Sequence, residues 1–224
     1  MERHLDKELA ELNKETLHMA TLTEEAIARS IDALKDLSVE RAKQVIEDDR
    51  KINQMELVID EKCLDMIALF QPMAIDLRFI TMTMKIGTDL ERIADLAVNI
   101  SERVLEIADK PHLKPLIDIP KLARLAQGMV KDTIDSFVNK DVKLAREVIL
   151  RDDQADFLRN LVQTELIGDY MLKDCSTVTR GIPLILIARH LERICDHATN
   201  IAEDVIYMVE AVVVKHHPEH LKET

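Results

Sequence analysis

The feature that most constrains this chain of 224 residues is an internal duplication. The segment LERIADLAVNISE at 90–102 realigns with LERICDHATNIAE at 191–203, an offset of 101, and nine positions are identical. Upstream, VERAKQVIEDDRKIN at 39–53 realigns with VKLAREVILRDDQAD at 142–156, an offset of 103. Two unrelated amphipathic helices would repeat only their apolar positions, whereas here Glu, Arg, Asp and Asn recur at matched places. The sequence therefore predicts two tandem copies of one structural unit.

Helical periodicity is clear from the first turn of the chain. Apolar and small side chains recur there at spacings of three and four residues, as in a helix with one buried face: Leu5, Leu9, Leu12, Thr16, Met19, Thr23 and Ala26. Only four glycines and six prolines are present, too few turn-forming residues for a barrel or sandwich of many short strands. We therefore expect an all-α protein.

Prolines and helix caps divide the chain. Ser38 and Asp141 stand at matched positions before a helix in each copy, and both residue types are favourable N-caps. Three prolines interrupt the segment 109–120, so it cannot continue a helix. The fold is expected to be two tandem three-helix bundles, at 1–109 and 120–215, joined by a Pro-rich linker at 110–119 and followed by a tail at 216–224. In the second bundle we expect helices over 120–139, 141–174 and 183–215.

Charge and targeting features narrow the classes of partner and compartment. The net charge is −12, which argues against nucleic acid as a partner and suits divalent cations or a basic protein surface. No apolar run reaches the about 18 residues that a membrane span needs, and the charged N-terminus is not a secretory signal. Three scattered cysteines (Cys63, Cys175 and Cys195) are typical of buried apolar residues in a reducing compartment. The expected location is the cytoplasm.

A stripe of polar residues is repeated in both copies. The third helix of each unit carries an acidic pair at i,i+4 spacing and an asparagine one turn later, opposite its apolar face. These stripes are therefore expected to face away from the core of their own unit. The second helix carries another pair at i,i+4 spacing, which shares that face if the second helix packs beside the third. The residues concerned are Asp49, Asn53, Glu91, Asp95 and Asn99 in the first copy, and Asp152, Asp156, Glu192, Asp196 and Asn200 in the second.

The spacing within these stripes favours a metal site. Glu91 and Asp95 repel each other, no basic residue three or four positions away relieves Glu91, and the same spacing recurs in the second copy. A cation held by both carboxylates removes that repulsion, and an all-oxygen set favours hard ions such as Mg²⁺, Mn²⁺ or iron. The alternative is a solvated charged face, with ordinary surface pairs between Arg92 and Asp95 and between Arg189 and Glu192.

The duplicated LERIADLAVNI and LERICDHATNI, with QPMAIDLRFI before the first and NIAEDVIY in the second, resemble the PhoU family of regulators of bacterial phosphate uptake. The resemblance covers nearly the whole chain. It implies two three-helix bundles with pseudo-twofold symmetry, usually dimeric, with multinuclear iron or other metal sites on their surfaces. Carried over by position, the metal candidates are Asp49, Glu91, Asp95, Asp152, Asp156, Glu192 and Asp196. Asn53 departs from the acidic form, and Leu96 stands where the family often has His, as His197 does here, so the first site is expected to hold fewer or weaker ions.

The resemblance also implies a function. PhoU-like proteins act as negative-regulatory adaptors between a phosphate ABC transporter ATPase and a sensor histidine kinase, and keep phosphate-starvation genes off when phosphate is plentiful. This implies no catalytic activity, no nucleic-acid partner, and at most peripheral membrane association through partners. Two alternatives stay open: a carboxylate-bridged di- or multinuclear metalloenzyme, and a purely structural helical scaffold.

Overall fold

The computed structural model describes residues 4–215, and within this range the chain contains helices and no strands. The predicted all-α fold is confirmed. The first unit consists of α1 (His4–Asp36), α2 (Val39–Phe70) and α3 (Ile75–Ile107). The second consists of α4 (Asp118–Asn139), α5 (Val142–Ile149), α6 (Asp152–Glu165) and α7 (Val178–Glu210).

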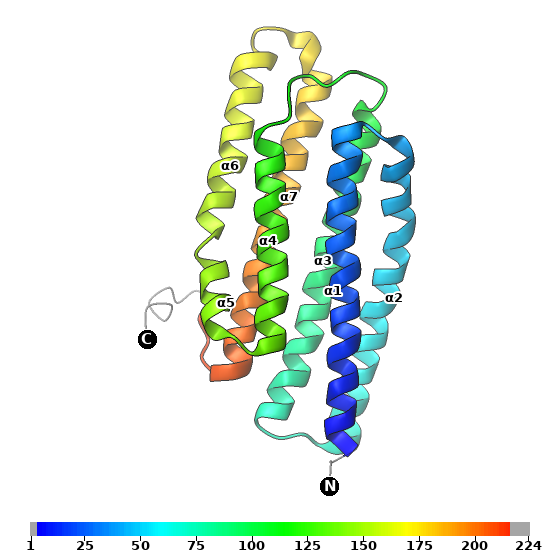
Figure 1. The fold of residues 1–224 in the computed structure, drawn as a ribbon, viewed down its shortest axis with the longest axis vertical. Coiled ribbons are helices and arrows are strands. Elements are labelled where there is room, and N and C mark those ends of the chain that lie inside the picture. Colours follow the sequence, from blue (N-terminus) through cyan, green and yellow to red (C-terminus); the bar gives the residue numbers. More distant parts are fainter. Residues whose placement is uncertain (1–3, 216–224) are drawn as a thin grey trace.

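The two units lie side by side with their long helices roughly parallel to one axis (Figure 1). Helices α3 and α7 pack against each other and run in opposite directions. Three polar contacts join them: Arg78 Nε donates to the carbonyl of Met208 at 3.2 Å, Lys85 pairs with Asp204, and His197 Nδ1 lies 2.7 Å from Asp89 Oδ1. Because residue numbers rise along one helix as they fall along the other, these contacts follow an antiparallel seam.

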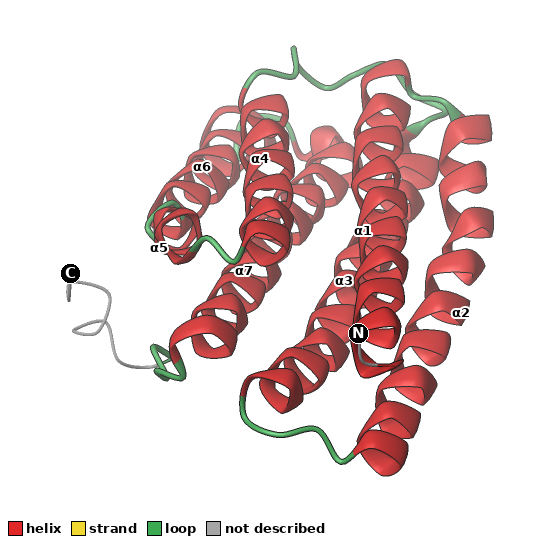
Figure 2. Cartoon of the chain, turned by 60° about the horizontal axis from the view of Figure 1, so that its bottom comes forward, coloured by secondary structure: helices red, strands yellow, loops and turns green. Residues whose placement is uncertain are grey.

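The duplication extends to the first helix of each unit, where sequence similarity is weak. The ten buried positions of α4 are 119, 122, 123, 126, 129, 130, 133, 134, 136 and 137. At the offset of 103, nine of them correspond to buried positions of α1, and the tenth corresponds to the partly buried Ala26. The two units therefore share a burial pattern over all their long helices, and Figure 2 shows them as two separate groups of helices.

The predicted N-caps are both confirmed. The Ser38 hydroxyl accepts a hydrogen bond from the backbone N–H of Arg41 at 3.3 Å, and the Asp141 carboxylate accepts one from Leu144 at 3.0 Å. The residue before each cap, Leu37 or Lys140, adopts a left-handed conformation with φ of 49° or 54°. The tight turn between the first two helices is therefore the same in both units.

The predicted helix over 141–174 is not continuous. The chain leaves the helix at Leu150 and Arg151, so α5 and α6 are separate, and α6 passes into a π-helical segment, Leu166–Met171, and then a short 3-10 turn, Cys175–Thr177. Arg151 instead forms an ion pair of 2.6 Å with Asp132 of α4. The break places Asp152 at the first position of α6, where helix N-termini favour acidic side chains.

Two other predicted helix starts also differ. Helix α4 begins at Asp118 rather than residue 120, and α7 begins at Val178 rather than Pro183. Pro183 removes one hydrogen bond, but packing keeps the preceding turn helical. Gly181 permits this packing, because a Cβ there would lie 2.9 Å from Met171 Sδ of the π-helical segment. The domain limits proposed from the sequence stay predictions, and the expected tail at 216–224 lies outside the described residues.

The surface agrees in part with the sequence prediction. Cys63 and Cys195 are buried, but Cys175 is exposed in the turn before α7, so the expectation of three buried cysteines is wrong for one.

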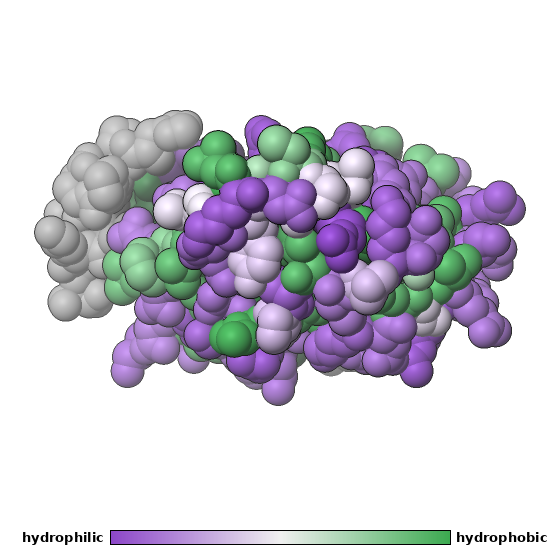
Figure 3. Space-filling model, turned by 90° about the horizontal axis from the view of Figure 1, so that it is seen from above, coloured by the Kyte–Doolittle hydropathy of each residue, from purple (hydrophilic) through white to green (hydrophobic). Residues whose placement is uncertain are grey.

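None of the helices between residues 4 and 215 combines the length and apolar character needed to cross a membrane. Seen from above, the molecule presents mostly hydrophilic residues with scattered hydrophobic patches (Figure 3).

Candidate functional site

The second helix of each unit packs along the third, as the sequence argument assumed. The carboxyl groups that the sequence predicts on these helices consequently lie near one another where the two helices meet, and we use the word groove for this helix–helix junction in each unit. Asp49 of α2 lies close enough to Asp95 of α3 for each negative charge to act on the other. In the second unit, Asp152 and Asp156 of α6 likewise lie close enough to Asp196 of α7 for their negative charges to act on one another. We refer to these as the first and second acidic grooves.

In the first acidic groove several oxygens are buried without a hydrogen-bond partner. Asn53 Nδ2 donates to Asp49 Oδ2 at 2.9 Å, but Asp49 Oδ1, Asn53 Oδ1 and Glu91 Oε2 accept no hydrogen bond from the described residues. Arg92 approaches from the outer side, 3.4 Å from Glu91 Oε2 and 3.3 Å from Asp95 Oδ2. The predicted pair of Arg92 with Asp95 is thus confirmed, and Arg92 also offsets part of the repulsion between the two acids.

Burial and mutual repulsion make these carboxylates easier to protonate. Burial, together with the nearby Asp95 charge, raises the pKa of Asp49 above its ordinary value. Burial raises the pKa of Glu91 as well, with further contributions from the Asp95, Glu56 and Asp49 carboxylates. Glu56 is a groove residue that the sequence analysis missed. The available signal was its position, three residues after Asn53 and seven after Asp49 on the same helix face.

The second acidic groove has a different arrangement. Arg159 of α6 reaches across it, with Nη2 2.5 Å from Asp156 Oδ1 and 3.3 Å from Glu192 Oε1. The expected partner of Glu192 was Arg189, so that prediction is wrong: the guanidinium comes from the neighbouring helix instead of the preceding turn. Asp152 Oδ1 is buried and forms no well-aligned hydrogen bond among residues 4–215, although the Thr199 hydroxyl lies near enough to oppose the rise in the pKa of Asp152.

The acids of the second groove are also shifted towards protonation. Burial is the largest cause of the raised pKa of Asp152, Glu192 and Asp196, and neighbouring carboxylates add to it in each case. The same carboxylates, after burial, raise the pKa of the Cys195 thiol beneath them, which therefore stays protonated. In the absence of a metal ion, this buried thiol is therefore a neutral side chain and not a nucleophile.

The remaining predicted residues are placed as follows. Asn99 and Asn200 lie half-buried one turn beyond the acidic pairs, and within residues 4–215 neither amide hydrogen-bonds to a carboxylate of its groove. Leu96 is buried, and His197 contacts Asp89 in the seam between the units.

The grooves are more covered than expected for stripes that face away from the core. The side chains of Glu91 and Glu192 are only 14% and 17% exposed, whereas those of Asp95 and Asp156 are 40% and 53% exposed. Glu91 and Glu192 are therefore largely shielded from water, whereas Asp95 and Asp156 remain accessible.

The residues of both grooves can be compared with what a metal ion requires of its ligands. Among the described residues, no three His, Cys, Asp or Glu side chains stand close enough together to form a ready-made site. However, buried oxygens of Asp49, Asn53, Glu91 and Asp152 accept no well-formed hydrogen bond from the described residues, and of these four only Glu91 has a cation, Arg92, within ion-pair distance. Carboxylate and amide oxygens are ligands for hard cations. The donor set therefore fits a hard metal ion, provided that the side chains close around it.

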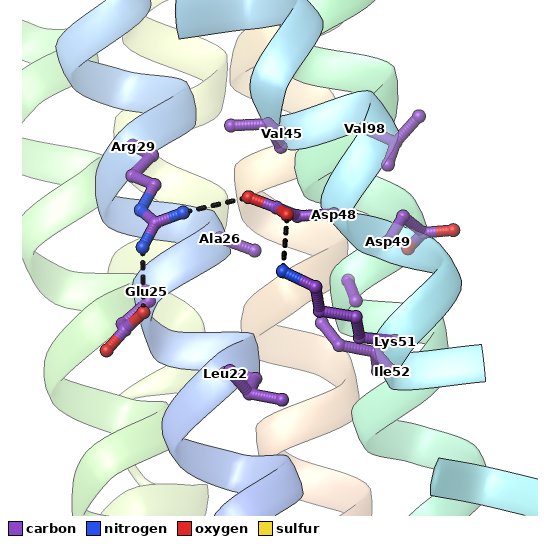
Figure 4. Close-up of a pocket in the computed structure, with 11 residues that line it drawn as sticks. Leu22, Glu25, Ala26, Arg29, Val45, Asp48, Asp49, Lys51, Ile52 and Val98 are labelled. Carbon is purple, nitrogen blue, oxygen red and sulfur yellow. Dashed lines mark hydrogen bonds and ion pairs between the residues drawn. The ribbon is translucent and has the colours of Figure 1, made fainter. Parts of the chain in front are cut away.

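A pocket of about 60 Å³ lies between α1, α2 and α3 in the first unit. Its apolar wall includes Ala26 and Ala94, and a chain of ion pairs crosses its mouth (Figure 4). Arg29 joins Glu25 and Asp48 at 3.0 Å each, and Asp48 also accepts from Lys51 at 2.7 Å. Asp49 also lines this pocket, although its carboxylate points away from these pairs (Figure 4), so the pocket and the first acidic groove adjoin each other at Asp49.

Comparison with known proteins gives one consistent result. The family model described as the PhoU domain matches residues 16–104 and again residues 119–205. A phosphate-specific transport system accessory protein PhoU homolog of Aquifex aeolicus is 43% identical over 219 residues, covering 98% of each chain. PhoU homolog 2 of Thermotoga maritima is 34% identical over 99% of this chain and 94% of its own length.

Solved structures agree with the sequence relatives. The crystal structure of PhoU from Pseudomonas aeruginosa superposes with a TM-score of 0.90 at 35% identity, covering 93% of this chain and all of the other. The structure of the phosphate transport system regulatory protein PhoU from Streptococcus pneumoniae superposes with a TM-score of 0.88 at 29% identity, covering 94% and 99% of the two chains. The similarity in sequence and in fold thus extends over both units.

Proposed function

This chain belongs to the PhoU family, and we propose that it is a regulatory accessory protein of phosphate uptake that binds hard metal ions in its two acidic grooves. Full-length relatives named as accessory proteins of phosphate-specific transport support the regulatory part. The single observation that supports the metal part is the set of buried carboxylate oxygens without hydrogen-bond partners, which occurs in both grooves.

The proposed ligands come from the second and third helix of each unit. In the first groove they are Asp49, Asn53, Glu91, Asp95 and Asn99, and in the second Asp152, Asp156, Glu192, Asp196 and Asn200. Iron, manganese and magnesium are the candidate ions, because all the donors are hard oxygens. A bound ion supplies positive charge to the groove. The ligands then act as a cross-link between two neighbouring helices, which stabilises the surface that the unit presents to partners.

The partners are proposed from the family. We place the chain in the cytoplasm as a homodimer and as a negative-regulatory adaptor between a phosphate ABC transporter ATPase and a sensor histidine kinase. The net charge of −12 supports contact with basic protein surfaces. No catalytic role is proposed. The metalloenzyme alternative differs from this proposal because it predicts catalytic turnover. The scaffold alternative differs because it predicts no bound metal.

Metal content is the first test. The purified chain is expected to retain iron or manganese by elemental analysis, Glu91→Ala with Asp95→Ala to lose the ions of the first groove, and Glu192→Ala with Asp196→Ala to lose those of the second. Glu40→Ala with Glu47→Ala is the matched control, because it removes two exposed acids of α2 outside the groove. Equal metal content in the parent, the two groove variants and the control would indicate that the acidic stripes are only a solvated surface and do not bind metal.

A gene deletion tests the regulatory part. Cells without this chain are expected to express phosphate-scavenging genes in phosphate-rich medium, and the wild-type gene to restore repression. Continued repression after a clean deletion would contradict the regulatory proposal. Phosphatase or oxidase turnover by the metal-loaded protein, absent from both groove variants, would instead favour the metalloenzyme.

A further inference from the structure

The outer face of α2 carries exposed apolar side chains along its C-terminal half. Four large ones lie there, with exposures of 62%, 43%, 58% and 75%: Leu57, Val58, Leu64 and Leu69. At 100° per residue they fall within about 140° of the helix circumference, so they share one face. Single exposed apolar residues are ordinary on a protein surface, so this face needs a second observation before it can indicate binding.

The internal duplication supplies that observation. At the offset of 103, three of the four positions are apolar and exposed again, on α6 and the turns that follow it: Val58 corresponds to Leu161, Leu64 to Ile167 and Leu69 to Leu172. The exposed acids between them have not been kept. Glu61 corresponds to Thr164, and Asp65 corresponds to Gly168. A position that meets only water has no need of an apolar side chain, so this selective retention indicates that the face contacts another molecule.

The face has the length and the position to receive a helix. From Leu57 to Leu69, α2 rises by about 18 Å, because each residue of a helix adds 1.5 Å. An apolar stripe of that length along a helix is the surface on which the apolar side of a second helix packs. Helix α2 lies at one outer edge of the molecule and α6 at the opposite edge, so neither outer face is covered by the other unit (Figure 1, Figure 2).

Two acids determine which kind of helix fits this face. Glu61 and Asp65 are exposed and lie one turn apart between the apolar residues. Lys62, the neighbouring cation, pairs instead with Glu15 of α1 at 3.1 Å, and within residues 4–215 neither Glu61 nor Asp65 forms an ion pair. A helix laid on this face takes water from both carboxylates. A lysine or arginine of that helix offsets the cost.

We propose that the outer face of α2 is a docking surface for an amphipathic helix of a partner protein, with lysine or arginine between its apolar residues. A second copy of this chain is disfavoured, because two such faces brought together would oppose four carboxylates. The same charges disfavour an anionic membrane surface. The proposal deepens the adaptor role proposed above and rests on that role for its biological partner. The matching face of α6 keeps the apolar residues without the acids, so it is expected not to select a basic helix.

Binding of a synthetic peptide to the intact chain tests the proposal. The probe is a fluorescein-labelled helical peptide of about 14 residues, with leucine at spacings of three and four and lysine elsewhere. Leu57→Ser with Leu64→Ser is expected to weaken its binding by about tenfold or more, because two apolar contacts are lost. Glu61→Gln with Asp65→Asn is expected to weaken it by about fivefold and to reduce its dependence on salt. Fluorescence anisotropy at two salt concentrations measures both effects.

Matched controls come from apolar residues of similar exposure. Ile117→Ser removes a side chain of the linker that is 57% exposed, and is expected to leave peptide binding within about twofold of the parent. Leu161→Ser with Ile167→Ser removes the matching pair of the second unit, and is expected to leave the salt-dependent binding within about twofold, because that face lacks the acids. A peptide with glutamate in place of lysine is expected to bind at least about tenfold more weakly than the lysine peptide.

Three outcomes would overturn the proposal. Equal binding by the parent and both α2 variants would mean that the exposed residues are scattered and independent. Conversion of a dimer to a monomer by Leu57→Ser with Leu64→Ser, measured by sedimentation without peptide, would show that a second copy covers the face. Binding of the parent to phosphatidylserine vesicles, lost in the same variant, would assign the face to a membrane.

Complementation of the gene deletion separates this proposal from the regulatory one. Leu57→Ser with Leu64→Ser is expected to keep the parent's melting temperature and fail to restore repression, whereas Ile117→Ser restores it. Restored repression by both variants would overturn the docking surface and leave the regulatory proposal intact. If the deletion itself has no effect, the regulatory proposal fails, and the peptide measurement alone decides whether the face binds a basic helix.

Discussion

The two units of this chain have equivalent helix caps and buried positions but differ in the size of the side chains at those positions. They share N-caps at Ser38 and Asp141 and nearly the same buried positions in their first helices. Yet the pocket of the first unit has Ala26 where the second unit has the fully buried Met129. Ala94 likewise corresponds to Cys195, which is larger and fully buried. After duplication, burial at a position has been kept while side-chain volume has changed.

Ion pairs between the first two helices show the same behaviour. Arg29 and Asp48 form a pair at 3.0 Å, and the residues at matched positions, Asp132 and Arg151, form one at 2.6 Å with the charges exchanged. The contact survives because both partners changed together. In this respect it differs from the matched positions Glu56 and Arg159, where only one side of the contact changed sign.

A third pair shows how the linker takes part. Glu15 and Lys62 pair at 3.1 Å in the first unit, but their counterparts at the offset of 103, Asp118 and Glu165, are both acidic. The buried Lys114 of the linker pairs with Glu165 instead. The linker thereby supplies a charge that the second unit's own helices lack.

The largest expected effect tests the difference in packing. Met129→Ala is expected to cost about 2–4 kcal/mol, because it opens a cavity in the second unit at the site where the first already has a pocket. The reverse change, Ala26→Met, is expected to shift stability by no more than about 1 kcal/mol, since the pocket accepts part of the added volume. Urea unfolding measures both. Equal losses for the two variants would mean that the units are packed alike.

The helix caps test what the units have in common. Ser38→Ala and Asp141→Ala are each expected to cost about 1 kcal/mol, because each removes the acceptor for one N–H of the first helical turn. Thermal or urea unfolding gives the two values, and Ser38→Asp and Asp141→Ser serve as conservative controls. A cost confined to one unit would contradict the view that the cap is an equivalent feature of both.

The charges of the Arg29–Asp48 ion pair can be reversed by mutation to match those of Asp132 and Arg151 in the second unit. Arg29→Asp or Asp48→Arg alone is expected to cost about 0.5–1 kcal/mol, and the double variant to recover most of that loss by reproducing the order of charges found in the second unit. A double-mutant cycle measured by unfolding provides the coupling energy. Additive losses would show that the pair in the first unit depends on its surroundings.

The smallest effect concerns the contact between the units. Burial, and then the Asp135 charge, raise the pKa of Glu24 above its ordinary value of 4.5, while Lys131 lowers it. The stability that this group contributes is therefore fully present below pH 4.5 and is lost as the pH rises through the raised, folded-state pKa. Glu24→Gln is expected to be a few tenths of a kcal/mol more stable than the parent at pH 7. Melting curves at several pH values should show this advantage disappear in acid; a constant difference would exclude titration of Glu24 as its cause.

Much of the fold could be predicted from the sequence, because its determinants are local. Apolar periodicity, the scarcity of Gly and Pro, and the caps at Ser38 and Asp141 each act within one or two helical turns. The duplicated Glu91 and Asp95 motif also located the candidate grooves, because side chains four residues apart must share a face of a helix.

Other features were decided by contacts between distant segments. The sequence predicted one helix over 141–174, but the chain breaks at Leu150 and Arg151, where Arg151 pairs with Asp132 of α4. Arg159 reaches Glu192 on α7 only because the two helices are neighbours, and the pattern of charges along one helix had assigned that role to Arg189. Helix-forming residues and their faces follow from short-range geometry, whereas the charge inside each groove depends on which side chains the packed helices bring within a few ångströms.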